Sequence, residues 1–180
     1  MFTWGAVALL TMINELSADK YKLLEEAWKY QDFITEQLFK IGISVNAYQS
    51  VDYQLRHGES ASGIEIKNDK QMAKTKNVYI EFNQTTLRGS TQKDSGIKQN
   101  DDSWLYVIGD YQKFFIFGKN QLRSLLEKVQ KKPTYYWDNY KIRVSCHKNE
   151  NGEITSNGLV IPVSYIEQTN LAIKTIEVKQ

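Results

Sequence analysis

The sequence contains little cysteine and little histidine. Its single cysteine, Cys146, cannot form an internal disulfide, and the two histidines, His57 and His147, are too few for a Cys/His zinc module or for the usual histidine-metal nuclease sites. The scarcity of cysteine indicates a reducing, cytoplasmic setting. Cys146 and His147 are adjacent, and neighbours on a strand point to opposite faces, so they do not predict a nucleophile pair.

Neither sign of charge predominates, and long apolar runs are missing. The net charge is only +2, from 23 lysines and arginines against 21 acidic residues, so overall charge does not require a nucleic acid or an anionic membrane as partner. Residues 1–11 are apolar, but they lack the basic start of a signal peptide and fall short of the roughly 20 residues that a membrane span needs. We therefore expect no membrane partner, and any site for a polyanion must be local.

Proline is scarce as well, and no low-complexity tract offers a linker. The two prolines are Pro133 and Pro162. The 180 residues, 41% of them hydrophobic, suffice for one core of ordinary size. We therefore predict a single domain over residues 1–180, with a core at about 20–130 and a C-terminal β extension at about 131–180.

The first predicted element is an amphipathic helix. Ser17 and Asp19 offer N-caps for a helix that runs to about Ile41, and Gly42 is a natural stop. Spacing along this helix predicts a buried face made of Leu24, Ala27, Trp28, Ile34 and Leu38.

The rest of the chain reads as strands with one more helix. Alternating residues, a Gly-Asp turn and helical spacing predict strands at 64–69 and 78–83, a hairpin of 104–108 and 113–117, a helix at 122–129 and β-structure at 135–144 and 159–166. This order predicts an α/β domain, bordering on α+β, with a mixed central sheet flanked by helices.

The two alternating segments carry polar rows. In 64–69 the outward row is Glu65, Lys67 and Asp69, and in 78–83 it contains Glu81 and Asn83. If the two strands pair as neighbours, these rows adjoin on one face. Such a pairing would gather three carboxylates around one lysine.

Clustered carboxylates need a compensating charge. Two of them about 4 Å apart repel by roughly 4 kcal/mol at an effective dielectric near 20, so a proton, a lysine or a metal must be close. Mg²⁺ prefers oxygen ligands and typically takes one or two protein carboxylates, with water and phosphate oxygens completing its shell. The same spacing also fits an exposed strand pair with ordinary cross-strand ion pairs, and both interpretations stay open.

A longer set of residues adds a resemblance. Asp69, then Glu81 on the next strand and a polar residue two places on, resembles the PD-(D/E)XK, or restriction-endonuclease-like, nuclease superfamily. The wider string resembles small phage and prophage proteins placed in that superfamily, over about residues 20 to 125; it comprises Tyr53-Gln54, Gly58-Glu59-Ser60, Gly63 to Asp69, Ile80-Glu81, Ser95-Gly96-Ile97 and Ser103 to Tyr106. The resemblance implies an αβββαβ core, Mg²⁺ or Mn²⁺ as cofactor and cleavage of DNA.

The superfamily motif can be aligned with this sequence in two ways, which we call the first and the second register. In the first register Asp69 and Glu81 hold the metal with help from Glu65, and Asn83 stands where the superfamily usually has its catalytic lysine, which leaves Lys67 as the substitute. The departure at Asn83 also fits a nuclease fold that has lost activity and only binds DNA or a protein.

In the second register Glu65-Ile66-Lys67 is the ExK element of the superfamily. Glu59 or Asp52 then supplies the earlier acid. Glu65 and Lys67 have a role in both registers. Because so short a nuclease often needs a second protomer to cut both strands, the resemblance also implies a homodimer.

Basic residues predict where DNA would bind. Lys70, Lys74 and Lys76 lie in the loop after Asp69, and Lys131, Lys132 and Arg143 belong to a basic tract that also contains aromatic residues. Contacts from such residues position a phosphate backbone without reading its sequence. A solvated lysine face fits the same composition.

Overall fold

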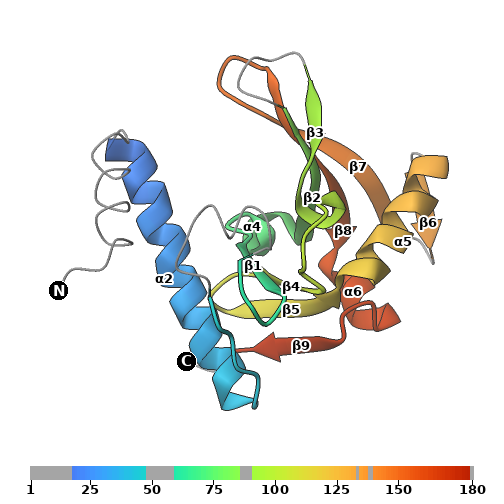
Figure 1. Ribbon diagram of the computed structural model, residues 1–180. Helices are drawn as coiled ribbons and strands as arrows, with labels where there is room; N and C mark the ends of the chain where they lie inside the picture. Colours follow the sequence, from blue (N-terminus) through green and yellow to red (C-terminus); the bar gives the residue numbers. More distant parts are fainter. Residues whose placement is uncertain (1–17, 48–58, 86–90, 133, 138–139, 179–180) are drawn as a thin grey trace. The chain divides into compact units, whose positions relative to one another are not determined.

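The computed structural model describes residues 18–47, 59–85, 91–132, 134–137 and 140–178. The chain divides into two compact units. The first unit comprises residues up to Asn68 together with Asp101–Ser103, and the second comprises Asp69–Asn100 and Trp104–Gln180. Each unit is described by itself below, and the elements carry the labels of Figure 1. Among the described residues, no helix is both long and apolar enough to cross a membrane.

The first unit contains helix α2 (Ala18–Lys40) and strand β1 (Ile64–Asn68). The predicted helix is therefore confirmed, and so is its stop. Gly42 adopts the left-handed backbone with φ of +83°, and the Ile43 N–H turns back to the Leu38 carbonyl at 2.9 Å. Glycine accepts this conformation without the steric cost that a side chain would add.

The buried face of α2 differs from the predicted one. Tyr30, Ile34 and Leu38 are at most 1% exposed, whereas Leu24 and Trp28 are each 38% exposed and Ala27 is also exposed. Trp28 precedes Tyr30 by two residues, which turns an α-helix by about 200°, so the two side chains lie on nearly opposite sides. The prediction is confirmed for Ile34 and Leu38. It was wrong for the other three residues because it left out Tyr30, with which the buried stripe of every fourth residue begins.

The described strands of the second unit form two sheets in which every pair is antiparallel. One sheet has the order β4 (Leu105–Gly109), β5 (Lys113–Gly118) and β9 (Lys174–Glu177). The other has the order β3 (Gln92–Asp94), β2 (Asn77–Thr85), β8 (Ile154–Pro162), β7 (Tyr140–Lys148) and β6 (Thr134–Trp137). The helices of this unit are α4 (Met72–Thr75), the 3₁₀ turn η1 (Gly96–Lys98), α5 (Lys119–Lys131) and α6 (Val163–Thr169). The chain is thus a mixed α and β protein, as predicted.

Several elements of the second unit match the sequence patterns. The predicted hairpin is β4 and β5, and the Asp110 carboxylate closes its turn by accepting hydrogen bonds from the Gln112 and Lys113 N–H groups at 2.8 and 2.9 Å. Helix α5 covers the predicted 122–129. Strand β8 pairs directly with β2, so the predicted C-terminal strands belong to the same sheet as the predicted strand 78–83.

Two local predictions for this unit were wrong. Residues 163–166 form the start of helix α6, whereas a strand was expected, because Pro162 ends β8 and Tyr165 and Ile166 then turn into the core. The second concerns Trp104: its large aromatic side chain, at the start of the predicted strand 104–108, favours a place in the core over a base-stacking surface, but the side chain is 60% exposed.

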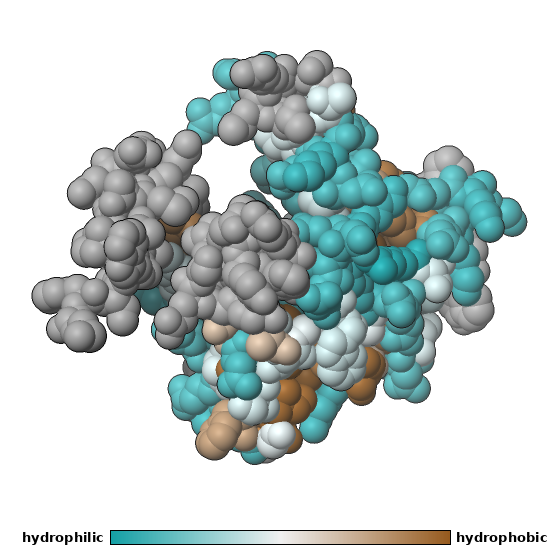
Figure 2. All heavy atoms as spheres, in the orientation of Figure 1, coloured by the Kyte–Doolittle hydropathy of each residue, from teal (hydrophilic) through white to brown (hydrophobic). Residues whose placement is uncertain are grey.

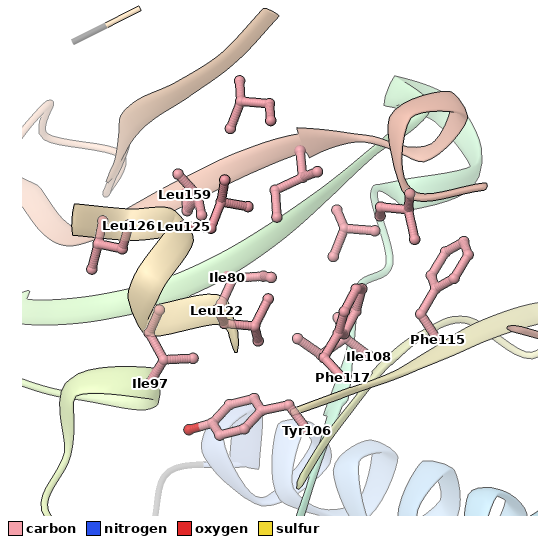
Figure 3. Packing of buried hydrophobic residues seen from close by; sticks show 14 of the residues in the cluster. Ile80, Ile97, Tyr106, Ile108, Phe115, Phe117, Leu122, Leu125, Leu126 and Leu159 are labelled. Atoms are coloured by element: carbon pink, nitrogen blue, oxygen red, sulfur yellow. The ribbon is translucent and has the colours of Figure 1, made fainter. Parts of the chain in front are cut away.

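The core of the second unit is one cluster of side chains from both of its sheets, from the helices α4, α5 and α6 and from the turn η1 (Figure 3). Leucines of α5 recur at the helical spacing and point toward the strands. The alternation of β2 is confirmed, because Val78, Ile80 and Phe82 are at most 4% exposed and the residues between them are half-buried. The labelled members of the cluster are Ile80, Ile97, Tyr106, Ile108, Phe115, Phe117, Leu122, Leu125, Leu126 and Leu159.

Candidate functional site

Two carboxylates and one lysine meet on strand β1 of the first unit. The Lys67 ammonium lies 2.7 Å from Glu59 Oε1 and 2.7 Å from Glu65 Oε1. Ile64 and Ile66 are buried, as the alternation predicted, but Glu65 is also only 9% exposed. A largely buried carboxylate therefore faces a lysine that both acids share. We call Glu59, Glu65 and Lys67 the β1 cluster.

A tight turn brings Glu59 back beside the strand. The Ser60 hydroxyl accepts the Ile64 N–H and donates to the Ile64 carbonyl, both at 2.9 Å, and Gly63 has φ of +67°. The second oxygen of Glu59 accepts the Ile66 N–H at 3.0 Å and the Gln31 amide of α2 at 3.2 Å. Three donors, the Lys67 ammonium, the Ile66 N–H and the Gln31 amide, therefore fix both carboxylate oxygens of Glu59.

The electrostatics of the β1 cluster follow from burial and from the shared cation. Burial raises the pKa of Glu65, the negative charges of Glu59 and Asp101 raise it further, and Lys67 opposes the rise. Burial lowers the pKa of Lys67, but the two carboxylates outweigh burial and hold that pKa above its usual value. Lys67 is therefore a permanent cation near neutral pH, suited to stabilising negative charge and unsuited to acting as a base.

Asp69 belongs to the second unit, where its carboxylate organises the backbone. Its Oδ2 accepts the Tyr79 N–H at 2.8 Å, and its Oδ1 accepts the Gln71 N–H at 3.1 Å. Burial raises the pKa of Asp69, and these N–H groups oppose the rise. Both oxygens are thus occupied by the turn that leads into α4 and by the start of β2.

Glu81 and Asn83 lie on β2 with partners of their own. Glu81 Oε1 accepts the Ser95 hydroxyl at 2.7 Å. The Asn83 amide donates to Gln92 at 3.2 Å, while its Oδ1 is buried with no hydrogen-bond partner among the described residues. Asp69 and Glu81 each have a structural partner, and among the described residues no hydrogen bond joins their side chains.

The expected pairing of 64–69 with 78–83 was wrong. Strand β2 has β8 as its neighbour along most of its length and β3 beside its last residues. Alternation identifies a strand and its buried face, but it does not identify the partner strand, which here comes from the C-terminal part of the chain. The residues of the first register are therefore split between the units, with Glu65 and Lys67 in the first and Asp69, Glu81 and Asn83 in the second. The described residues of the second register, Glu59, Glu65 and Lys67, all belong to the first unit.

The residues that could hold a metal are the two acids of the β1 cluster. The described part of the chain contains no group of three or more His, Cys, Asp or Glu side chains arranged for a metal ion. Glu59 and Glu65 nevertheless converge on one cation, the Lys67 ammonium, and two carboxylates are the usual protein share of a Mg²⁺ shell. Asp52, the alternative earlier acid, lies outside the described residues.

The predicted DNA-binding residues lie on separate elements of the second unit. Lys70, Lys74 and Lys76 are exposed in and around α4, and the positive φ of Lys76, 55°, ends that helix. Lys131 and Lys132 are exposed at the end of α5, and Arg143 is half-buried on β7. The five lysines are therefore accessible to a polyanion, and Arg143 is accessible in part.

Gln31 is the functional candidate that the sequence analysis missed. It follows the buried Tyr30 on α2 and fixes Glu59 through its amide. A lone glutamine on a helix carries no motif, so only the fold reveals its contact. Comparisons with protein-family models, with curated proteins and with solved structures gave no match to this chain.

Proposed function

We propose that the protein is a metal-dependent nuclease that hydrolyses phosphodiester bonds in DNA, with a restriction-endonuclease-like fold and its active site at the β1 cluster. In this proposal Glu65-Ile66-Lys67 is the ExK element, and Glu59 is the earlier acid, with Asp52 as the alternative. The observation that carries the proposal is the convergence of a largely buried carboxylate and a second, oriented carboxylate on the Lys67 ammonium.

The chemistry assigns a role to each residue. Glu59 and Glu65 would hold Mg²⁺ or Mn²⁺, which supplies positive charge for the scissile phosphate and lowers the pKa of water. Lys67 stays protonated beside them and stabilises the negative charge that grows on the phosphate oxygens. Gln31 and the Ile66 N–H hold Glu59 in one orientation, so little reorganisation is needed.

A binding measurement tests the metal site without relying on cleavage. Titration calorimetry with Mn²⁺ should detect binding by the wild-type protein and a loss of at least about tenfold in affinity in Glu65→Gln, since removing one carboxylate removes a ligand and a charge. Asp69→Asn is the matched control, because its carboxylate serves the backbone of the second unit. Equal Mn²⁺ affinity in wild type and Glu65→Gln would contradict the assignment of the site.

A second function is a binding module on the same fold without catalysis. Asn83 favours it, because that position has no lysine in the first register. The compensation of Glu59 and Glu65 by Lys67 also favours it, since an ion-paired cluster is stable with no metal present. This protein would bind DNA in a salt-sensitive manner with no need for a metal.

A further inference from the structure

The five-stranded sheet of the second unit has one face in the core and one outer face. Ile80, Ile142 and Leu159 point into the core and are at most 2% exposed. Their strand neighbours therefore point outward. The register places two rows on the outer face: Tyr79, Val160 and Arg143 in one, and Lys93, Gln84, Ser156 and His147 in the other.

A shallow pocket lined by residues with polar groups opens on this outer face. Its volume is about 770 Å³, a size typical of ligand sites. Hydrophilic side chains predominate over the strands β2 and β3 in the view of Figure 2. The lining residues come from β2, β3, β7 and β8, and are Tyr79, Glu81, Gln84, Thr85, Lys93, His147, Thr155 and Ser156.

An aromatic ring is fixed on the floor of this pocket. A Cβ at Gly158 would lie 2.3 Å from two atoms of the Tyr79 ring, so the ring packs directly on the backbone of β8. The Tyr79 hydroxyl is also 3.0 Å from the Ser156 hydroxyl. Contacts at one face and at the hydroxyl hold the ring in place, and the ring still lines the open pocket. A rigid ring of this kind is a platform on which a nucleic-acid base can stack.

Two cations, Lys93 and Arg143, lie on the same outer face as the ring. Lys93 on β3 is exposed at one end of its row, which ends at the exposed imidazole of His147 on β7, and the half-buried Arg143 lies on β7 in the row of Tyr79. Neighbouring strands are about 4.8 Å apart, so the row of four from β3 to β7 spans about 14 Å. The acid in the pocket, Glu81, is engaged by the Ser95 hydroxyl. Cations around a fixed ring fit a ligand that alternates phosphates with flat bases.

We propose that the outer face of this sheet binds single-stranded DNA, with a base stacked on Tyr79 and phosphates near Lys93 and Arg143. A single strand fits better than a duplex, because the bases of a duplex are already stacked and paired and cannot reach a ring on a sheet. The choice of DNA rests on the proposed function; the surface itself rests on the pocket, the ring and the cations.

The test is fluorescence anisotropy with a labelled 20-nucleotide oligo(dT) and a blunt 20-base-pair duplex, both in EDTA so that no cleavage occurs. The wild-type protein should bind oligo(dT) at least about tenfold more tightly than the duplex. Lys93→Gln/Arg143→Gln should weaken oligo(dT) binding at least about tenfold and lower the slope of log affinity against log salt by about 1.4, since each phosphate contact contributes about 0.7. Lys128→Gln/Lys174→Gln, which alters the same charge elsewhere in the unit, is the control and should bind nearly as the wild type does.

Two further variants test the ring without a change of charge. Gly158→Ala displaces Tyr79, and Tyr79→Leu removes the ring but keeps an apolar side chain; each should weaken oligo(dT) binding at least about fivefold. Thermal melts identify any variant that fails to fold, and Tyr79→Leu then replaces Gly158→Ala. The proposal is overturned if the duplex binds as tightly as oligo(dT), or if folded Lys93→Gln/Arg143→Gln protein binds as the wild type does. Because no measurement depends on metal or cleavage, a protein that fails to cut DNA leaves this result unaffected.

Discussion

Replacing Lys67 by glutamine is expected to lower the rate of metal-dependent DNA cleavage at least about 100-fold, the usual cost of removing a single group that stabilises charge in a transition state. The Lys67 ammonium touches both acids of the β1 cluster at 2.7 Å, and no neutral side chain can replace its charge there. The measurement is a single-turnover cleavage rate at saturating Mg²⁺.

The conservative variant separates the charge of Lys67 from its shape. Lys67→Arg keeps the cation beside Glu59 and Glu65 and should retain more activity than Lys67→Gln, whereas Lys174→Gln, on β9, should cleave at the wild-type rate. Equal rates for Lys67→Gln and the wild type would remove Lys67 from the site.

Substituting Gly96 by alanine should cost the second unit about 3 kcal/mol of unfolding free energy, the largest stability effect expected here. Gly96 has φ of +50°, and a Cβ there would lie 2.1 Å from the backbone oxygen of Glu81. A left-handed alanine costs about 1–2 kcal/mol, and forcing an atom against a backbone group in a packed region costs about 1–3 kcal/mol more. Urea denaturation measures the loss.

Gly152 is the matched control for Gly96. It also has a positive φ, +79°, but a Cβ at Gly152 would meet nothing within 4 Å. Gly152→Ala should therefore lose only the part of the unfolding free energy that comes from the left-handed backbone, about 1–2 kcal/mol. If the two variants lost the same unfolding free energy, the close packing of Gly96 on β2 would make no contribution to stability.

The parts of the fold that could be predicted are those set by neighbouring residues. Alternation identified β2, the Asp110 turn identified the β4–β5 hairpin, and Gly42 identified the end of α2. Each depends on side-chain periodicity or on backbone conformation over a few residues, and both can be read from a short stretch of sequence.

The parts that could not be predicted depend on distant residues. Strand β2 pairs with β8, about 80 positions along the chain by the register Tyr79↔Val160, and no local pattern identifies that partner. Trp28 is a large apolar residue of the kind expected in a core, yet the buried stripe that begins at Tyr30 leaves it 38% exposed.

The candidate site divides in the same way. Glu65 and Lys67 were expected because they share a strand, and Glu59 was an alternative because it precedes that strand. The Ser60 turn that returns Glu59 to Lys67, and the amide of Gln31, depend on tertiary structure. The role of Asp69 in backbone hydrogen bonds could not be predicted, because the sequence does not distinguish an aspartate that accepts N–H groups from one that binds a metal.

The most direct test of the nuclease proposal is cleavage of supercoiled, linear and branched DNA in EDTA, Mg²⁺ or Mn²⁺ by wild type, Glu65→Gln and Glu81→Gln, all prepared identically. With the active site at the β1 cluster, wild type and Glu81→Gln cut with metal and not in EDTA, and Glu65→Gln does not cut. Failure of the wild type to cut any substrate with either metal, or unimpaired cutting by Glu65→Gln, would contradict it.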